Sequence, residues 1–338
     1  MRFLTFLFVF FVCSLPCRTV AQDFCRLAFW NVENLFDTQD DSTRNDDDFT
    51  PAGKNNWTAK RYKTKQQNLC KTIIAMGSTS QSGSRLEMPL AIGLAEVEND
   101  KVLRDLCNGT PLRKFKYKYI HYDSPDKRGI DNALLYRSDV FKPFLSKNIC
   151  TSDSSRDFYT RDILLVEGTT GKGDTIILLV NHFPSKRNIE NEQHRIAIAQ
   201  QLRHIMDTLL DAHPSAAIIA MGDFNAAPDE KEMRSILLKK SGCRFVNLMA
   251  NKKGSGSYKY QGEWSFIDQI IVSENVTRKE GCRLQLKSEY GEVFNADFLL
   301  VDDERYLGKK TNRTYLGPRY NGGYSDHLPV YIDLYRTK

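Results

Sequence analysis

Short apolar runs alternate with longer amphipathic segments along most of the chain. The apolar runs have the length of buried strands, and they predict strands over residues 27–30, 89–95, 133–136, 163–166, 175–180, 216–221, 267–272 and 328–334. Helical spacing occurs over residues 60–76 and 191–210, and the second segment carries on one face Ile198, Leu202, Ile205 and Leu209. Strands that recur with helices between them favour an α/β or layered α+β fold over a helical bundle.

Two segments show neither the apolar runs of strands nor the spacing of helices, and we expect irregular structure there. They are residues 36–58, which are acidic and rich in Asn, and residues 250–263. Within the first, Asp46-Asp47-Asp48 predicts a solvated loop, because this run lacks the alternating spacing and the glycine of a calcium loop. No repeat or low-complexity linker divides the chain, so we expect one domain over residues 22–338.

The first 21 residues have a different pattern. Arg2 precedes an apolar run over residues 3–12, and small residues end the segment at Ala21. This pattern is typical of a secretory signal peptide over residues 1–21, and the run is too short for a comfortable membrane span. A lipoprotein anchored through Cys17 is disfavoured by the proline directly before it. We therefore expect a secreted or periplasmic protein without stable membrane insertion.

Composition is that of an ordinary globular protein, with 41% hydrophobic and 27% charged residues. Removing residues 1–21 takes away Arg2 and Arg18 and no acids, which lowers the formal charge from +6 to +4. A mildly basic protein is compatible with a polyanionic substrate, but this charge does not establish one. No protein partner can be inferred, and we expect a monomer.

Cysteine spacing argues against a zinc site. Six cysteines remain after residues 1–21 are removed, and none of them belongs to a CxxC pair. Export permits disulfides, but the sequence does not choose between possible pairings. Buried free thiols are an equally good interpretation of the same residues.

Polar residues suited to chemistry stand where six of the apolar runs begin or end. They are Asn31, Glu33, Glu96, His182, Asp223, Asn225, Asp268, Asp326 and His327. A single Asp at a strand end is most often a turn residue, and a single buried His is most often a core hydrogen-bonding group. The recurrence at several strand ends favours one shared site, because binding sites collect at strand ends and in the loops beyond them. In an extended segment, residues two apart project to the same side, so we expect Asn31 with Glu33 and Asp223 with Asn225 to act as pairs.

Seven short blocks contain these residues, and together they resemble a known family. The blocks, in chain order, are WNVENLFD, GLAEVEN, RGIDNALLY, VNHFPSK, GDFN, IDQIIVS and SDHLPV. They are similar to the ordered signature blocks of the endonuclease/exonuclease/phosphatase superfamily, which includes the pancreatic-type deoxyribonucleases. The resemblance implies an α+β fold, a four-layer α/β/β/α sandwich of two packed mixed β-sheets flanked by helices. It also implies divalent-metal-dependent hydrolysis of phosphate esters.

The resemblance also implies roles for individual residues. Glu96 matches the metal-binding glutamate, Asn31 and Glu33 complete or orient the metal shell, and Asp326 stands near the metal. Asp223 and Asn225 match the pair that handles the attacking water and the phosphate. Asp268 matches the acid that orients His327, and His182 matches a histidine on the leaving-group side in the deoxyribonucleases.

The chemistry of phosphate esters independently favours these residue types. A hard cation such as Mg²⁺, or Mn²⁺ in its place, is held by one or two carboxylates and neutralises charge that develops on phosphate oxygens. Either Asp223 or His327 is suited to take the proton of water, and the sequence leaves that choice open. Cations that follow or flank the strands are candidates to hold substrate phosphates, namely Arg128, Arg161 and Lys186, although a solvated charge is an equal interpretation of each.

We therefore expect a secreted, Mg²⁺-dependent phosphodiesterase, and we favour a nuclease, specifically an endonuclease, that acts on extracellular nucleic acid. The alternative within the same class of hydrolases is a phosphatase or phospholipase that acts on inositol phosphates or sphingomyelin. No Trp-Trp or Phe-Trp pair suggests a membrane-inserting hairpin, which weighs against the lipid substrate. A non-catalytic binding module is the remote alternative, and the intact set of acids and histidines weighs against it.

Asp326 and His327 are adjacent, so in a regular strand their side chains would point to opposite faces. Both can serve one site only at a loop-to-strand transition. The Asn321-Gly322-Gly323 turn upstream supplies a pliable loop, and the strand is expected from Leu328.

Overall fold

A computed structural model of the chain describes residues 24–79, 86–186, 190–237, 244–254, 256–278 and 281–337. The signal peptide expected over residues 1–21 and Cys243 lie outside these residues. Within them the five cysteines are free, and all except Cys150 are buried. Among the described residues no helix is both long and apolar enough to cross a membrane.

The first sheet of the described chain has seven strands and contains both ends of the fold. Its strands are β1 (Phe24–Leu35), β4 (Ala91–Val97), β5 (Tyr117–His121), β6 (Asp131–Arg137), β15 (Leu284–Leu286), β16 (Glu292–Val293) and β21 (Val330–Arg336). The order is β15-β21-β1-β4-β6-β5, with β16 paired to β21. β1 runs parallel to β4 and antiparallel to β21, so the sheet is mixed.

The second sheet has six strands in the described chain and is also mixed. Its strands are β7 (Phe141–Ile149), β8 (Ile163–Thr170), β9 (Thr175–His182), β10 (Ala217–Asp223), β11 (Phe245–Asn247) and β14 (Asp268–Ser273). The order is β11-β14-β10-β9-β8-β7. β9 and β10 are parallel, whereas β10 and β14 are antiparallel.

The remaining elements are short hairpins and turns. Two-stranded ribbons are formed by β2 (Ser78–Thr79) with β3 (Leu86–Glu87), β12 (Tyr258–Tyr260) with β13 (Glu263–Ser265), β17 (Leu300–Asp302) with β18 (Lys309–Thr311), and β19 (Tyr315–Leu316) with β20 (Arg319–Tyr320). Single 3₁₀ turns occur at Asp47–Phe49, Pro111–Phe115, Ser154–Arg156, Glu274–Val276 and Asp297–Leu299. The β12–β13 ribbon lies partly within residues 250–263, where the sequence predicts irregular structure.

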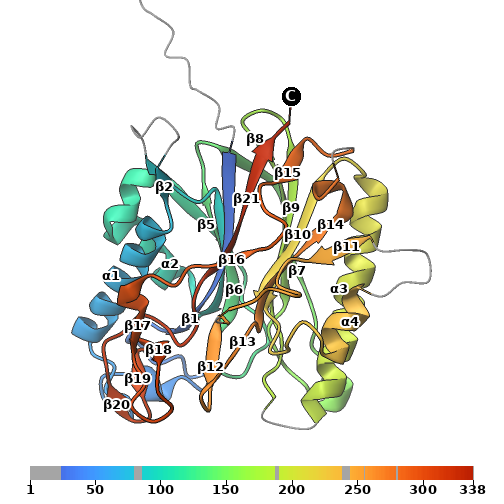
Figure 1. Cartoon of the computed structure of the whole chain (residues 1–338). Coiled ribbons are helices and arrows are strands. Elements are labelled where there is room, and N and C mark those ends of the chain that lie inside the picture. The colour runs from blue at the N-terminus through green and yellow to red at the C-terminus, as the bar shows by residue number, and fades with distance from the viewer. Residues whose placement is uncertain are drawn as a thin grey trace, which may run out of the picture.

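Two helices cover the outer face of each sheet (Figure 1). The helices are α1 (Ala59–Ala75), α2 (Asp100–Gly109), α3 (Glu190–Ala212) and α4 (Lys231–Leu237). The outward side chains of β1, including Ala28 and Trp30, share a core with residues of α1 and α2, such as Leu69. Residues of α3 and α4 pack against the second sheet in the same way. The four-layer α/β/β/α sandwich predicted from the sequence is therefore confirmed.

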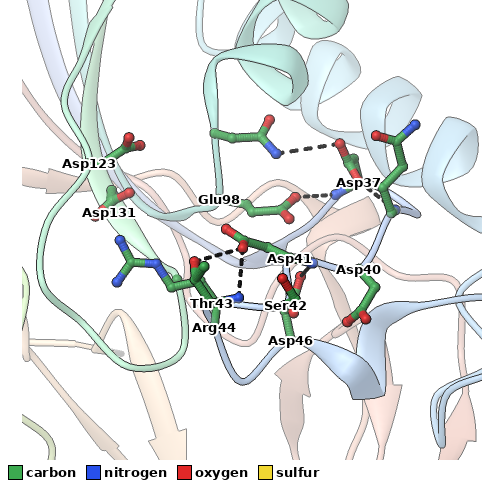
Figure 2. A pocket seen from close by; sticks show the side chains of 13 residues that line it. Asp37, Asp40, Asp41, Ser42, Thr43, Arg44, Asp46, Glu98, Asp123 and Asp131 are labelled. Atoms are coloured by element: carbon green, nitrogen blue, oxygen red, sulfur yellow. Dashed lines mark hydrogen bonds between the residues drawn. The ribbon is translucent and has the colours of Figure 1, made fainter.

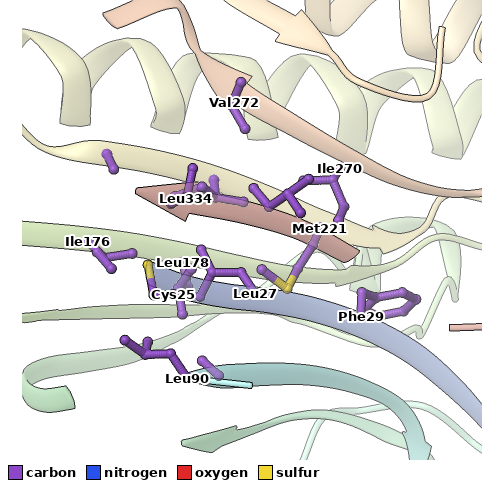
Figure 3. Packing of buried hydrophobic residues seen from close by; sticks show 14 of the residues in the cluster. Cys25, Leu27, Phe29, Leu90, Ile176, Leu178, Met221, Ile270, Val272 and Leu334 are labelled. Carbon is purple, nitrogen blue, oxygen red and sulfur yellow. The ribbon is translucent and has the colours of Figure 1, made fainter. Parts of the chain in front are cut away.

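The inner faces of the two sheets form the central core. Alternate residues of β1, Leu27 and Phe29, face the second sheet, where Met221 of β10 and Ile270 of β14 meet them (Figure 3). Burying apolar area on both faces of a strand explains why the predicted strands read as continuous apolar runs rather than as alternating ones.

Strand boundaries differ from the predicted ones at functionally relevant places. β1 continues through Asn31 to Leu35 instead of ending at Trp30. β21 begins at Val330 rather than at Leu328, because Pro329 lacks the backbone donor that a strand residue supplies. His327 therefore lies before the strand, at the loop-to-strand transition that the sequence predicts.

Gly93 of β4 lies where the two sheets pack closely against each other. A Cβ atom at this position would lie 3.0 Å from Met221 Sδ, 3.1 Å from Val180 Cγ1 and 3.2 Å from Phe29 Cδ2. We expect Gly93→Val to lower the free energy of unfolding by about 1–3 kcal/mol, since added methyl groups overpack the core. Urea unfolding measures this loss. Gly171→Val is the matched control, because no atom lies within 4 Å of its added Cβ, and equal losses for the two variants would contradict the packing argument.

Candidate active site

Strand pairing places three of the predicted site residues at one level of the second sheet. Asp223, the last residue of β10, is paired with His182 at the end of β9 and with Asp268 at the start of β14. Asn31 approaches from the first sheet, and its Nδ2 donates a hydrogen bond to Asp223 Oδ2 at 3.0 Å. The buried carboxylate of Asp223 therefore joins the two sheets at one edge of the sandwich.

The backbone near this edge is irregular in both β1 and β4. The β1–β4 register shifts between Asn31 and Leu35, and the β4–β6 register shifts between Ala95 and Val97. Glu33 has φ 51° and Glu96 has φ 64°, a left-handed conformation that side chains with a Cβ rarely adopt. Bulges of this kind are over-represented beside active sites, where they redirect a side chain.

These dihedral angles correct one expectation from the sequence. Asn225 also has a positive φ, 48°, so neither Asn31 with Glu33 nor Asp223 with Asn225 is a pair in extended backbone. Local hydrogen bonds set the geometry instead. The Glu33 amide donates to Asn31 Oδ1 at 3.0 Å, and the Asn225 amide donates to Asp223 Oδ1 at 2.9 Å. Each pair is brought together by a local hydrogen bond at an irregular stretch of backbone rather than by the two-residue repeat of a regular strand.

His327 is held by hydrogen bonds at its imidazole and backbone and by one ring contact. Its Nδ1 lies 2.8 Å from Asp268 Oδ2, which confirms the predicted hydrogen bond between these residues. Ser257 Oγ donates to the same Asp268 oxygen at 2.6 Å, and the Tyr258 ring lies 4.7 Å from the His327 ring. The Trp30 indole donates to the His327 carbonyl at 2.9 Å. The imidazole is therefore oriented toward Asp223, whose Oδ2 lies 3.8 Å from Nε2.

Ser325 explains why polar residues precede β21. Its hydroxyl donates to the Asn31 carbonyl at 2.7 Å and accepts the amide of His327 at 3.0 Å. The three residues of the Ser-Asp-His motif thus have separate directions: Ser325 anchors the loop to β1, Asp326 faces Arg313, and His327 faces the second sheet.

The two histidines beside Asp223 have opposite electrostatic environments. His182 Nε2 lies 3.7 Å from Asp223 Oδ2, and burial, with the cations Arg161 and Arg128, holds the pKa of His182 well below its usual range. Burial alone would also lower the pKa of His327, but the carboxylates of Asp268 and Asp223 outweigh burial and raise it well above the usual range. At neutral pH a neutral imidazole and an imidazolium therefore lie beside the carboxyl group of Asp223.

The pKa of Asp223 itself is displaced upward. Burial and the charge of Asp268 raise it, the nearby His327 lowers it, and the net result is a pKa of about 7. Asp223 has 2% of its surface exposed, so water does little to stabilise the ionised form. A carboxyl group with this pKa is suited to exchange protons near neutral pH.

Two cationic side chains that lie near the acids of the first sheet were not predicted from the sequence. Arg313 donates from Nε to Glu33 Oε1 at 3.0 Å, and its Nη2 lies 2.9 Å from Asp326 Oδ2. Lys65 is 1% exposed and donates to Thr314 Oγ1 and the Tyr324 carbonyl, and burial lowers its pKa to about 8.

The unusual position of Lys65 is recognisable in the sequence, whereas that of Arg313 is not. Lys65 lies four residues before Leu69 and eight before Ile73, so it occupies the apolar stripe of α1. A lysine at such a position needs buried oxygen partners, which is a reason to suspect a site. The segment around Arg313 is polar throughout and has no comparable contrast.

The residues present fit a divalent cation near Glu96. The Asn34 amide donates to Glu96 Oε2 at 2.8 Å, and among the described residues its other carboxylate oxygen accepts no hydrogen bond. Asp326 likewise offers Oδ1, 3.9 Å from His327 Nε2. Glu33 does not offer a free oxygen, because Arg313 occupies Oε1 and the Thr314 amide donates to Oε2 at 2.7 Å. Glu33 is therefore placed to orient neighbouring groups, not to bind an ion directly in this arrangement.

Asp223, Asp268 and His327 also form a compact group whose ligand atoms lie within 4.8 Å of one another. In this group Asp268 Oδ2 already accepts from His327 and Ser257, which suits proton handling better than metal binding.

The three cations predicted to hold phosphate differ in their surroundings. Arg161 is nearly buried and donates to Asp126 Oδ2 at 3.0 Å and to the Phe183 carbonyl at 2.7 Å. Lys186 donates to Glu230 at 2.6 Å. Arg128 lies 3.9 Å from Glu96 Oε2, with 45% of its side chain exposed. Arg128 is thus the predicted cation that both reaches the site and faces solvent.

Comparison with known proteins gives a family and a fold. The sequence profile of the endonuclease/exonuclease/phosphatase family matches residues 26–336. No curated protein matches the sequence. The chain therefore belongs to the endonuclease/exonuclease/phosphatase family, whose members are metal-dependent phosphoric ester hydrolases.

Solved structures share this fold at low sequence identity. A humanized TDP2 of D. rerio has a TM-score of 0.57 and 16% identity, over 93% of this chain and 99% of that chain. The mannosyl-6-phosphatase of Bacteroides thetaiotaomicron has a TM-score of 0.55 and 17% identity, over 92% and 99%. The catalytic domain of human Nocturnin has a TM-score of 0.55 and 16% identity, over 94% and 96%.

The ion pair between Arg313 and Glu33 predicts a pH-dependent stability. Burial, followed by repulsion from Asp326, raises the pKa of Glu33, and Lys65 and Arg313 counteract both. In metal-free buffer at pH 8 we expect Arg313→Gln to lower the free energy of unfolding by about 1–3 kcal/mol, because the buried Glu33 carboxylate loses one of its two cationic neighbours. Below the pKa of Glu33 the acid is neutral in both proteins, so the loss should shrink as the pH falls to about 4.5.

Urea unfolding at the two pH values measures this difference. Arg319→Gln is the control, since Arg319 is exposed on β20. An equal loss at both pH values for Arg313→Gln would show that the charge of Glu33 is not the cause.

Proposed function

We propose that this protein is a secreted, Mg²⁺-dependent phosphodiesterase that hydrolyses nucleic acid as an endonuclease. One observation carries the proposal: a buried carboxyl group with a pKa near 7 lies between a neutral and a cationic histidine. Asp223 Oδ2 is 3.7 Å from His182 Nε2 and 3.8 Å from His327 Nε2. Hydrolysis of a phosphodiester needs a proton acceptor for the attacking water. It also needs hydrogen-bond donors to the nonbridging and leaving oxygens of the phosphate. Asp223 is suited to be the acceptor, and the two histidines are suited to be the donors.

Asp223 is the better candidate for the general base. The raised pKa of His327 means that its imidazole is already protonated near neutral pH and cannot accept the proton of water. Asp223 is ionised in a substantial fraction of molecules at the same pH. Asn31 and the Asn225 amide hold the two oxygens of Asp223, so its carboxylate is oriented before substrate binds.

The histidines then act on phosphate oxygens. The imidazolium of His327, held by Asp268, is placed to stabilise negative charge on a nonbridging oxygen. Neutral His182 lies on the other side of Asp223, where its N–H can donate to the leaving oxygen. Glu96 and Asp326 would hold the Mg²⁺ ion, which when bound neutralises charge on the phosphate.

Nucleic acid is favoured as the substrate by His182, which the deoxyribonuclease-like pattern places on the leaving-group side of a diester. The mature chain is mildly basic, and Arg128 and Arg313 present partly exposed guanidinium groups beside the acids. A similar fold, the TDP2 of D. rerio, has been solved with a single-strand DNA product. Secretion rests on the signal-peptide pattern of residues 1–21.

A phosphomonoesterase is the second candidate. The fold is about equally similar to the mannosyl-6-phosphatase of B. thetaiotaomicron and to TDP2, so fold similarity does not separate the two substrates. Inositol phosphates and sphingomyelin are further candidate substrates that fold similarity does not separate from nucleic acid. A panel containing plasmid DNA, an RNA oligonucleotide, a sugar phosphate, an inositol phosphate and sphingomyelin discriminates between the candidates. Hydrolysis of a phosphomonoester or the lipid, with none of the nucleic acids, would overturn the nuclease proposal.

The metal requirement is tested with Glu96. We expect Glu96→Gln to lower turnover by orders of magnitude with little change in thermal stability, because it keeps the shape of the side chain and removes its charge. Excess chelator should abolish the activity of the unmodified protein, and Mg²⁺ or Mn²⁺ should restore it. Glu304→Gln, an exposed acid, is the control. Full activity in excess chelator would refute the metal requirement.

The Asp268–His327 pair is tested by a double-mutant cycle. We expect His327→Ala to lower kcat by roughly 10²-fold or more, as losing acid–base catalysis does. Asp268→Asn should cost much less in the His327→Ala background than alone, because Asp268 acts through the imidazole. Losses that add would show that the two side chains work independently.

A further inference from the structure

Lys65 of α1 is buried close to the acids of the candidate site, and no step proposed above uses it. Its side chain is 1% exposed, in the apolar stripe that the helix forms with Leu69 and Ile73. Taking an ammonium group out of water is unfavourable, so the packing of the helix alone would favour an apolar residue at this position. The contacts of Lys65 therefore point to a task other than packing.

Lys65 holds both ends of one loop. Its Nζ donates to Thr314 Oγ1 at 2.7 Å and to the Tyr324 carbonyl at 2.6 Å. These acceptors lie near the two ends of residues 312–324, which we call the site loop. The loop is closed on itself, because the Tyr324 amide donates to the Asn312 carbonyl at 2.6 Å. A single buried side chain thus joins the closed loop to α1.

Asn68 adds to this anchoring from the next turn of the helix. Its Nδ2 donates to the carbonyls of Gly322 and Gly323 at 3.0 and 2.8 Å. Together with the bond from Lys65 to Tyr324, one face of α1 holds three consecutive carbonyl groups. They are the carbonyls directly before the Ser-Asp-His motif, so α1 fixes the backbone from which that motif starts.

The site loop connects this anchoring to two acids of the site. The Thr314 amide donates to Glu33 Oε2 at 2.7 Å. Arg313 donates to Glu33 Oε1 at 3.0 Å and lies 2.9 Å from Asp326 Oδ2. Asp326 itself stands two residues beyond the held carbonyl of Tyr324. A shift of the site loop would therefore displace the partners of both carboxylates.

The charge of Lys65 supports the same arrangement. Burial lowers the pKa of Lys65 to about 8, and the carboxylates of Glu33, Asp326 and Glu96 counteract this effect. The ammonium group is thus predominantly charged at neutral pH. Among the described residues it forms no ion pair with these three acids, so it acts on them through the site loop and through its charge rather than by direct contact.

A second group of acids lacks a buried lysine. A cavity of 470 Å³ between the loop after β1 and the turn after β4 is lined by several acids, among them Asp46 and Glu98 (Figure 2). Arg44 is the cationic side chain among the described residues that line it. Asp46 is only 2% exposed, contrary to the solvated loop predicted over residues 46–48. The presence of neighbouring acids therefore does not by itself explain why Lys65 is buried.

We infer that Lys65 is a positioning residue of the hydrolytic reaction, which holds the site loop, and through it Arg313 and Asp326, in the geometry that the reaction uses. The inference rests on the hydrolytic function proposed above. A displacement of about 1 Å at reacting groups can lower turnover on the order of 10²-fold. A role in folding alone would lower stability and leave the turnover of folded molecules unchanged.

The kinetics of Lys65→Met test the inference. Methionine keeps the apolar stem but cannot donate, so we expect kcat per folded molecule to fall by roughly 10–100-fold, with KM changed by less than about threefold. Circular dichroism at the assay temperature gives the folded fraction. Lys63→Met is the matched control, since it makes the same exchange at an exposed position of α1, and it should keep kcat. A kcat for Lys65→Met within about twofold of the unmodified value would overturn the inference.

Hydrogen exchange gives a readout that does not depend on activity. In Lys65→Met we expect the amides of residues 312–328 to exchange at least about tenfold faster, whereas those of β10 keep their rates. Unchanged exchange in the site loop, or equal acceleration throughout the protein, would overturn the inference. Thr314→Val is the second variant if Lys65→Met does not fold. It removes one acceptor of Lys65, keeps the amide that donates to Glu33, and should change kcat and exchange in the same direction.

Failure of the proposed function can be told apart from failure of this inference. If the protein hydrolyses a phosphomonoester or a lipid instead of nucleic acid, the nuclease proposal fails, and kcat of the variants is measured on that substrate with the same expected losses. If it hydrolyses no ester of the panel, the proposed function fails altogether. Exchange in the site loop then decides whether Lys65 anchors it, and unchanged rates in Lys65→Met would overturn that too.

Discussion

The hydrogen bond from Asn31 to Asp223 crosses from one sheet to the other, and the geometry of the site depends on it. Asp223 lies at the end of a strand whose other residues are apolar and buried, so its carboxylate has few partners within its own sheet. Asn31 supplies a donor from the opposite sheet at 3.0 Å. Because the sheets pack through rigid apolar faces below this point, the two side chains are held in register by the whole core. The polar cluster at the edge of the sandwich is thereby oriented by the packing of the two sheets.

Electrostatics divide this cluster into groups with different tasks. His182 and His327 are at nearly equal distances from the same carboxylate oxygen, but Arg161 and Arg128 stand behind the first and Asp268 behind the second. The fixed charges around each imidazole, rather than its distance from Asp223, set its protonation. When the pKa values of neighbouring groups are pushed apart in this way, one site can contain a proton acceptor and a cationic donor at the same pH.

Much of the fold could be predicted from the sequence because its strands are long, apolar and separated by amphipathic helices. The sequence blocks that resemble the family predicted the four layers, and they predicted that the site residues lie in one region. The positions at which the backbone is irregular could not be predicted from the hydrophobic pattern. The bulges at Glu33 and Glu96 and the turn at Asn225 replace the two-residue repeat with left-handed residues, and no local composition marks these positions. Burial of Asp46 was also missed, because it depends on packing against segments far away in the chain.

The sequence by itself determined which polar residue types adjoin each apolar run, because covalent order fixes them, whereas the exact strand ends differ, as in β1, which continues to Leu35. It thereby specified the acids, the histidines and the class of reaction that they suit. Only the tertiary structure decided which charges meet. Arg313 reaches Glu33 across 280 residues, and Lys65 reaches the Tyr324 carbonyl across 259. Contacts at such separations depend on how sheets and loops pack, and the energy of each depends on burial that no single segment specifies. The protonation of His182, His327 and Asp223 follows from those contacts and was therefore settled only in the folded protein.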